Sequence, residues 1–75
     1  MEQLLKIINT VRINKNQAEL PAISATTNLR TDIGFNSLDL AELTVRIESA
    51  FGVDIFEDGI ISTVGEILEK INAHP

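Results

Sequence analysis

The sequence predicts an all-α domain: a bundle of three main helices, with room for a short fourth helix and with a long loop after the first helix. Apolar residues recur at helical spacing in three segments. No segment of useful length alternates between apolar and polar residues as a half-buried strand does. With 75 residues, the chain should form one domain over residues 1–75, because so short a chain cannot divide its core in two.

The first helix is predicted from the start of the chain to about Ile13. Its apolar residues follow the i, i+3, i+4, i+7 pattern of an amphipathic helix, with one further residue widening the stripe: Leu4, Leu5, Ile7, Ile8 and Val11.

A long loop is predicted over residues 14–35. Pro21 and the polar cluster 24–28 are typical of turns, and the length exceeds that of most connections in compact domains, which is typical of functional or packed loops. We expect the loop to lie over the core, anchored by its apolar residues: Leu20, Ile23, Leu29 and Ile33.

The second helix is predicted to begin after the turn at Gly34. Asn36 can cap it and Asp39 lies in its first turn, while Gly52 is a plausible end. One face is predicted to be buried, and it carries Leu40, Leu43, Ile47, Ala50 and Phe51. The opposite face carries Leu38, Ala41 and Val45 beside Glu42 and Ser49. This second helix should therefore expose an apolar strip next to acidic residues.

Residues 53–61 mix acidic and bulky apolar residues and predict a loop with at most one short helical turn. Residues 63–66 then match a capping box. Apolar residues repeat the helical pattern beyond it, and they are Val64, Ile67, Leu68 and Ile71. The last helix is expected to end near Asn72.

Composition narrows the classes of function. The net charge is −5, and residues 31–75 hold nine acidic residues against two basic ones. Such a surface repels phosphate backbones, argues against nucleic-acid binding and favours partners with basic patches. The chain has no cysteine, and no apolar stretch approaches the length that spans a membrane. We therefore expect a soluble cytoplasmic protein without a disulfide or a thiolate metal site.

Ser37 is the position that points to chemistry. It lies in the predicted first turn of the second helix, where unpaired N–H groups and the helix dipole favour a phosphate. Taken alone, this position is more typical of an ordinary helix cap formed by Asn36 and Ser37. The apolar strip with flanking carboxylates suits docking of a basic, partly hydrophobic partner. Two alternatives stay open: scattered surface Leu and Val residues are normal, and the first loop could cover them.

Three segments carry a resemblance to a known family. The run 29–43, Leu-Arg-Thr-Asp-Ile-Gly-Phe-Asn-Ser-Leu-Asp-Leu-Ala-Glu-Leu, resembles the signature of the acyl carrier proteins. Residues 51–55, Phe-Gly-Val-Asp-Ile, and the Ser-Thr-Val at 62–64 resemble later parts of the same family. The resemblance implies an acyl-carrier-like bundle in which Ser37 receives 4'-phosphopantetheine from coenzyme A through a phosphopantetheinyl transferase. The thiol of that arm would hold acyl groups as thioesters for fatty acid, polyketide or related biosynthesis.

The resemblance also implies a partner-binding set and a pocket. The matching partner-binding positions are Asn36, Leu38, Asp39, Glu42, Val45, Glu48, Asp54 and Glu57. The expected partners are the transferase and the acyl-loading, condensing and modifying enzymes, bound by a monomer through their basic patches. Core residues could border a pocket for part of an acyl chain, or serve only in packing: Leu40, Leu43, Ile47, Ile55, Ile67 and Leu68.

The sequence departs from the family pattern at three places. Asn36 stands where an Asp is usual, Arg46 adds a positive charge between Glu42 and Glu48, and Phe56 stands where Pro is common in a segment shorter than that of fatty-acid carriers. These departures favour a specialised carrier for a polyketide, aminoacyl or secondary pathway.

Other classes of function have weaker support. The single histidine, His74, lies next to the last residue, and the residues before Ser37 do not have the spacing of a nucleophile elbow. A calcium-binding loop around Gly59 would lack the oxygen ligands that are needed at Phe56 and Gly65. We therefore expect neither an enzyme nor a metal site. The remaining alternative is an acidic helical interaction module that carries no prosthetic group.

Overall fold

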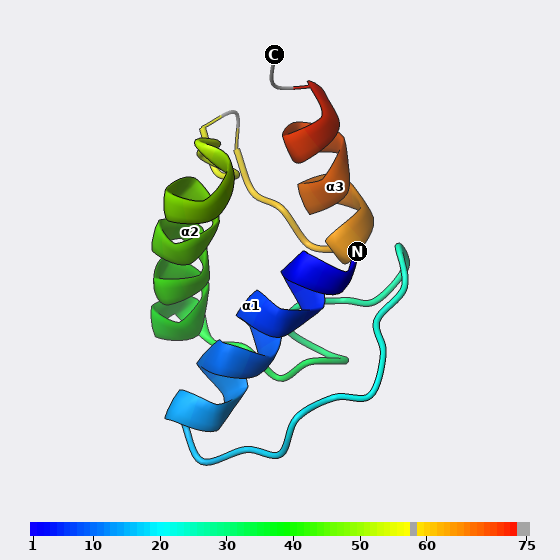
Figure 1. The fold of residues 1–75 in the computed structure, drawn as a ribbon, viewed down its shortest axis with the longest axis vertical. Coiled ribbons are helices and arrows are strands. Elements are labelled where there is room, and N and C mark those ends of the chain that lie inside the picture. The colour runs from blue at the N-terminus through cyan, green and yellow to red at the C-terminus, as the bar shows by residue number, and fades with distance from the viewer. Residues whose placement is uncertain (58, 74–75) are drawn as a thin grey trace.

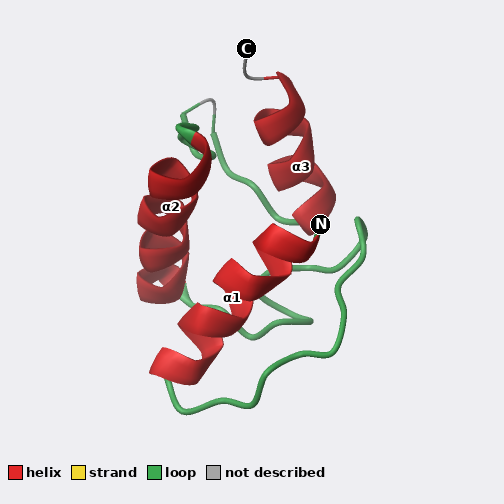
Figure 2. Cartoon of the chain, viewed as in Figure 1, coloured by secondary structure: helices red, strands yellow, loops and turns green. Residues whose placement is uncertain are grey.

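The computed structural model describes residues 1–57 and 59–73. Three helices follow one another, α1 (Glu2–Asn14), α2 (Ser37–Phe51) and α3 (Val64–Ala73). In Figure 1, α1 crosses beside α2, while α2 and α3 stand on either side of the segment that joins them. The long first loop runs around one end of the molecule. The described residues contain no strand, only one isolated β-bridge (Figure 2). The predicted all-α architecture is confirmed.

The core lies where the three helices and the two loops meet. α1 contributes Leu4, Ile8 and Val11, α2 contributes Leu40, Leu43 and Ile47, and α3 contributes Val64 and Ile67. The predicted apolar faces of all three helices are thus confirmed, with one error. Ala50 is exposed, because the larger Phe51 makes the contact with the core at the last turn of α2.

The first loop packs over the core as predicted. Leu29 and Ile33 are buried, and Leu20 and Ile23 are partly buried against them. Phe35, which was not among the predicted core residues, is also buried.

A buried amide holds the first half of this loop to α1. Asn9 Nδ2 donates to the carbonyl oxygen of Leu20 at 3.0 Å, and Leu20 N donates back to Asn9 Oδ1 at 2.7 Å. The two bonds satisfy the Asn9 side chain, which would otherwise be costly to bury.

The second half of the loop is joined to the start of α3. Leu29 N donates to the Ser62 carbonyl oxygen at 2.8 Å, and Val64 N donates to the Thr27 carbonyl oxygen at 3.0 Å. Gly65 N donates to the Ala25 carbonyl oxygen at 2.8 Å. A Cβ at position 65 would lie 2.8 Å from that same oxygen, so the contact requires glycine.

The predicted capping box of α3 is present. Glu66 Oε1 accepts from Thr63 N at 3.1 Å, and Glu66 N donates to Thr63 Oγ1 at 3.3 Å. Backbone hydrogen bonds from Ser62 and Thr63 lower the pKa of Glu66 from its ordinary value.

Between α2 and α3 the chain forms turns that bury three apolar side chains, Val53, Ile55 and Ile61. Gly52 ends α2 in the left-handed region, with φ 71°. No fourth helix forms in residues 53–57 or 59–62. Across the described part of the chain, no helix has both the length and the apolar character needed to cross a membrane.

Candidate functional site

The start of α2 is fixed by a reciprocal cap. Asn36 Oδ1 accepts from Asp39 N at 2.9 Å, and Asp39 Oδ2 accepts from Asn36 N at 2.9 Å. Ser37 is the first helical residue and is exposed. The N–H groups of its first turn that the cap leaves unpaired have no acceptor within the helix. A negatively charged group on the Ser37 hydroxyl would therefore lie beside unpaired amides and the positive end of the helix dipole.

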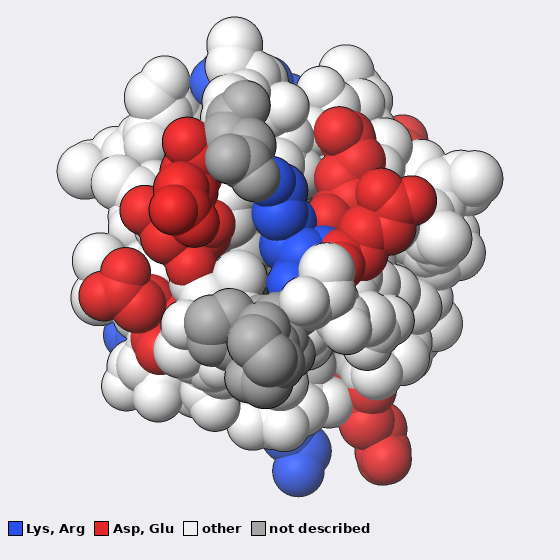
Figure 3. All heavy atoms as spheres, turned by 90° about the horizontal axis from the view of Figure 1, so that it is seen from above, with Lys and Arg blue, Asp and Glu red and all other residues white. Residues whose placement is uncertain are grey.

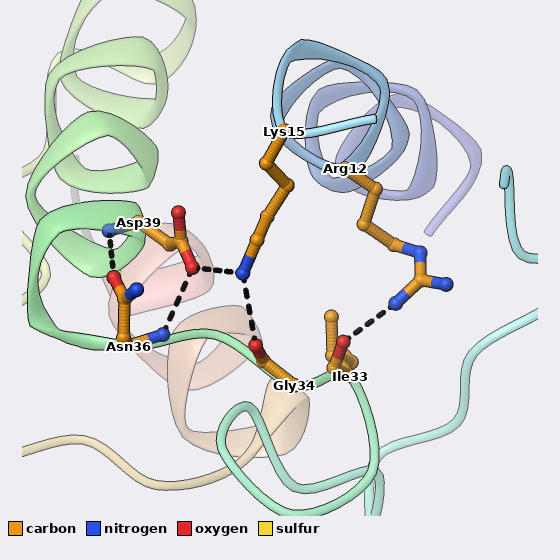
Figure 4. Close-up of polar contacts among 6 residues, drawn as sticks. All are labelled: Arg12, Lys15, Ile33, Gly34, Asn36 and Asp39. Carbon is orange, nitrogen blue, oxygen red and sulfur yellow. Dashed lines mark hydrogen bonds and ion pairs between the residues drawn. The ribbon is translucent and has the colours of Figure 1, made fainter. Parts of the chain in front are cut away.

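A lysine at the end of α1 fastens this cap (Figure 4). Lys15 Nζ lies 2.5 Å from Asp39 Oδ2 and 3.1 Å from the Gly34 carbonyl oxygen. The ammonium also lies 5.9 Å from the centre of the Phe35 ring. One side chain therefore joins α1, the last residues of the first loop and the first turn of α2.

An arginine one turn earlier holds the backbone of the same loop. Arg12 Nη1 donates to the Ile33 carbonyl oxygen at 2.6 Å, and Arg12 Nε donates to the Ala18 carbonyl oxygen at 2.8 Å. Neither Arg12 nor Lys15 was predicted from the sequence to belong to the site.

The structure gives Asp39 an internal position. Its side chain is buried, unlike the other acidic residues assigned to partner binding. Burial alone would raise its pKa, but hydrogen bonds from Lys15 and the Asn36 backbone, together with the Lys15 charge, lower the pKa below its ordinary value. Asp39 is therefore ionised at neutral pH and is used within the fold.

The other face of α2 is open to solvent. Leu38 is 79% exposed and Val45 is 68% exposed, with Ala41 between them also exposed. The predicted apolar strip therefore lies on the surface. Among the remaining predicted partner-binding residues, Glu48, Asp54, Glu57 and Asn36 are exposed and Glu42 is partly exposed.

Glu42 lies at the edge of this face nearest α1. Its Oε2 accepts from Asn14 Nδ2 at 3.0 Å and from Arg46 Nε at 2.9 Å. These hydrogen bonds, from Asn14 first and Arg46 second, lower the pKa of Glu42. Arg46 is thus paired within α2 rather than standing alone as a positive charge.

A shallow groove of about 260 Å³ adjoins Ser37. It is lined by Arg30, Ser37, Leu40, Ala41, Thr44 and Phe56. Of the residues predicted to border a pocket, Leu40 lines it. Leu43, Ile47, Ile55 and Ile67 are fully buried in the core, and Leu68 is partly buried against it.

Charge is unevenly distributed over the surface. At the end of the molecule that carries the last turns of α2 and α3, acidic side chains gather in patches on either side of a narrow basic strip (Figure 3). Within the described residues, no group of three or more histidine and acidic side chains could hold a metal ion. His74 lies outside the described residues.

Comparison with known proteins identifies the family. A family model described as "Phosphopantetheine attachment site" matches residues 3–71. The acyl carrier protein of Prochlorococcus marinus (strain MIT 9515) is 28% identical over 74 residues, which cover 96% of this chain and 92% of that protein. The acyl carrier protein of Lactobacillus acidophilus (strain ATCC 700396 / NCK56 / N2 / NCFM) is 28% identical over 75 residues, covering 97% and 94%.

No solved structure gives a significant match to the chain. The family model nevertheless spans almost the whole domain, including the cap, the exposed serine and the groove. The chain therefore belongs to the family of phosphopantetheine attachment-site domains, whose members hold a covalently attached 4'-phosphopantetheine and act as carriers rather than as enzymes.

Proposed function

We propose that this chain carries acyl intermediates as thioesters on a 4'-phosphopantetheine arm attached to Ser37. The observation that supports this most directly is the position of Ser37, an exposed first residue of a firmly capped helix. Its hydroxyl has no hydrogen-bond partner among the described residues. It can therefore accept a phosphodiester without breaking any contact of the fold.

The residues around Ser37 fit a phosphate-linked arm. The first-turn amides of α2 would face the phosphate, and the groove beside Ser37 offers apolar contact to the part of the arm that follows. The arm supplies the thiol on which the acyl group is carried. The chain itself contributes attachment, orientation and recognition, since catalysis belongs to the partner enzymes.

The proposed docking surface is the exposed face of α2, made of Leu38, Ala41, Val45, Glu42 and Glu48. Its apolar residues would supply contact area, and the carboxylates would steer a basic partner during encounter. Asn36, Asp54 and Glu57 are proposed as flanking contacts, since all three are exposed near the two ends of the helix. Asp39 would contribute to docking by holding the start of α2 in place.

The partners of this surface would be the phosphopantetheinyl transferase and the enzymes that load, condense and modify the acyl group. The proposed place of action is the cytoplasm, where coenzyme A is available, and the proposed state is a monomer. The pairing of Arg46 with Glu42 supports a specialised partner set, as in a polyketide, aminoacyl or secondary pathway, over a typical fatty-acid synthase.

The attachment site is tested by mass. The purified chain is incubated with coenzyme A and a promiscuous phosphopantetheinyl transferase, and its intact mass is measured. We expect a gain of one phosphopantetheine group that is lost in Ser37→Ala and kept in Ser49→Ala, which removes another exposed serine of α2. A gain that survives Ser37→Ala, or no gain at all, would show an unmodified interaction module or a different attachment site.

The docking surface is tested by charge reversal. Glu48→Lys should slow modification of Ser37 by about 2- to 10-fold at low salt, because reversing a surface charge mainly lowers the association rate. The difference should shrink as salt is added, since ions screen exposed charges. Glu2→Lys in α1, which is also exposed, makes the same change in net charge away from this face. Equal rates for the two variants would count against the proposed surface.

A further inference from the structure

The groove beside Ser37 is lined by both polar and apolar residues. Ser37, Ala41 and Thr44 lie on one stripe of α2, since residues at i, i+4 and i+7 share a helix face. Arg30 from the first loop and Phe56 from the second loop complete its walls. The groove therefore adjoins the proposed attachment residue and extends along α2 as far as Thr44.

Arg30 is the cation of this groove, and among the described residues its charge has no partner. Its side chain is exposed, and no described residue forms a hydrogen bond or an ion pair with its guanidinium. Its backbone is nevertheless held in place, because Arg30 N donates to Asn28 Oδ1 at 2.9 Å. The Arg30 backbone is thus held by the loop, while its guanidinium has no partner among the described residues.

The other cations near the start of α2 are already engaged. Arg12 is bonded to two backbone carbonyl groups, and Lys15 is bonded to Asp39 and to the Gly34 carbonyl group. Both side chains are thereby held to the loop backbone and the cap, whereas Arg30 has no such contact among the described residues. In a chain with a net charge of −5, Arg30 is the positive side chain that remains for an anion on Ser37.

We propose that the Arg30 guanidinium binds the phosphodiester of the Ser37-linked arm and directs the adjoining part of the arm into this groove. This inference rests on the proposed attachment at Ser37. A guanidinium offers a planar fork of N–H donors that fits two oxygens of one phosphate. The apolar lining residues Leu40, Ala41 and Phe56 suit the methyl-bearing segment of pantetheine that follows the phosphate. Arg30 is then a positioning residue for the arm and takes no part in transfer.

The test compares the chain before and after loading with unacylated phosphopantetheine, by NMR of ¹⁵N-labelled protein. In the natural sequence we expect loading to shift the Arg30 Nε–H signal and the amide signals of Ala41, Thr44 and Phe56. In loaded Arg30→Gln the last three shifts should be lost, and the ³¹P signal of the arm should move relative to that of the natural sequence.

The matched control is Lys6→Gln, which removes one positive charge from an exposed position of α1 and should leave all of these shifts intact. Arg30→Lys keeps the charge without the planar fork and should retain only part of the shifts. Folding should survive in each variant, because the substituted side chains have no partner among the described residues.

The outcomes separate this inference from the proposed function. Complete loading with an unmoved Arg30 Nε–H signal, or equal shifts in Arg30→Gln and the natural sequence, would overturn the role of Arg30 and leave the carrier function standing. Absence of any mass gain would overturn both.

Discussion

Replacing Asp39 by Asn should lower the stability of the domain, because it removes the single negative charge that pairs with Lys15. In the natural chain Asp39 Oδ2 accepts from both Lys15 Nζ and Asn36 N, and the two side chains of the ion pair are only 24% and 10% exposed. A hydrogen bond to a charged group contributes roughly 1.5–3 kcal/mol when well shielded. The Asn amide oxygen can still accept from Asn36 N, and partial exposure of Lys15 screens its charge. We therefore expect a loss of about 1–2 kcal/mol in the free energy of unfolding.

The assay is urea unfolding at neutral pH, followed by circular dichroism. In thermal unfolding, the same loss of stability would lower the Tm of a domain of this size by roughly 4–16 °C. Glu48→Gln is the matched control, since it removes one negative charge from the same helix at an exposed position. It should change stability by no more than about 0.5 kcal/mol.

The pH dependence gives the refuting result. The pKa of Asp39 is lowered in the folded state, so its ionised form stabilises the fold above the unfolded pKa. That contribution is lost as the pH falls through the lowered, folded-state pKa. The gap between the natural chain and Asp39→Asn should therefore close in acid. Equal urea midpoints at neutral pH, or a gap that stays constant into acid, would refute the reasoning.

Three further substitutions test other parts of the structure. Gly65→Ala should destabilise by about 1–2 kcal/mol in urea unfolding, because the clash with the Ala25 oxygen outweighs the better helix propensity of alanine; increased stability would contradict the close approach. Arg12→Gln should lower the free energy of unfolding by about 1–3 kcal/mol, because it leaves loop carbonyl oxygens unpaired; an unchanged urea midpoint would show that water replaces the guanidinium as their hydrogen-bond donor. Val45→Ala should change stability by less than about 0.5 kcal/mol yet slow phosphopantetheine transfer in the mass assay, whereas an unchanged rate would remove Val45 from the docking surface.

The helices could be predicted because their determinants are local. Apolar spacing located all three, and the capping residues Asn36 and Thr63 marked where α2 and α3 begin. The same periodicity overestimated the buried face of α2 at Ala50, because a pattern does not show where the core ends. It also gave no signal for Phe35, which lies in a loop without any period and is buried by the path of the backbone.

The site was predictable only where one helix contains it. The exposure of Ser37, Leu38 and Val45 follows from the face of α2 that packs inward. The pairing of Lys15 with Asp39 spans 24 positions and depends on how α1 crosses α2. The place of Arg30 beside Ser37 likewise depends on the course of the first loop. Contacts of this kind follow from tertiary packing, which neither composition nor spacing specifies.

The hydrogen bonds and ion pairs of the α2 side chains reduce the negative charge that this helix presents to an approaching protein. The helix contains three carboxylates, yet Asp39 is committed to Lys15, and Glu42 is shared between Asn14 and Arg46. Among the described residues only Glu48 of the three has no such partner. The attraction felt at a distance from this helix is therefore closer to that of one free acid than to that of three, and it is centred toward the C-terminal half of the helix rather than on Ser37.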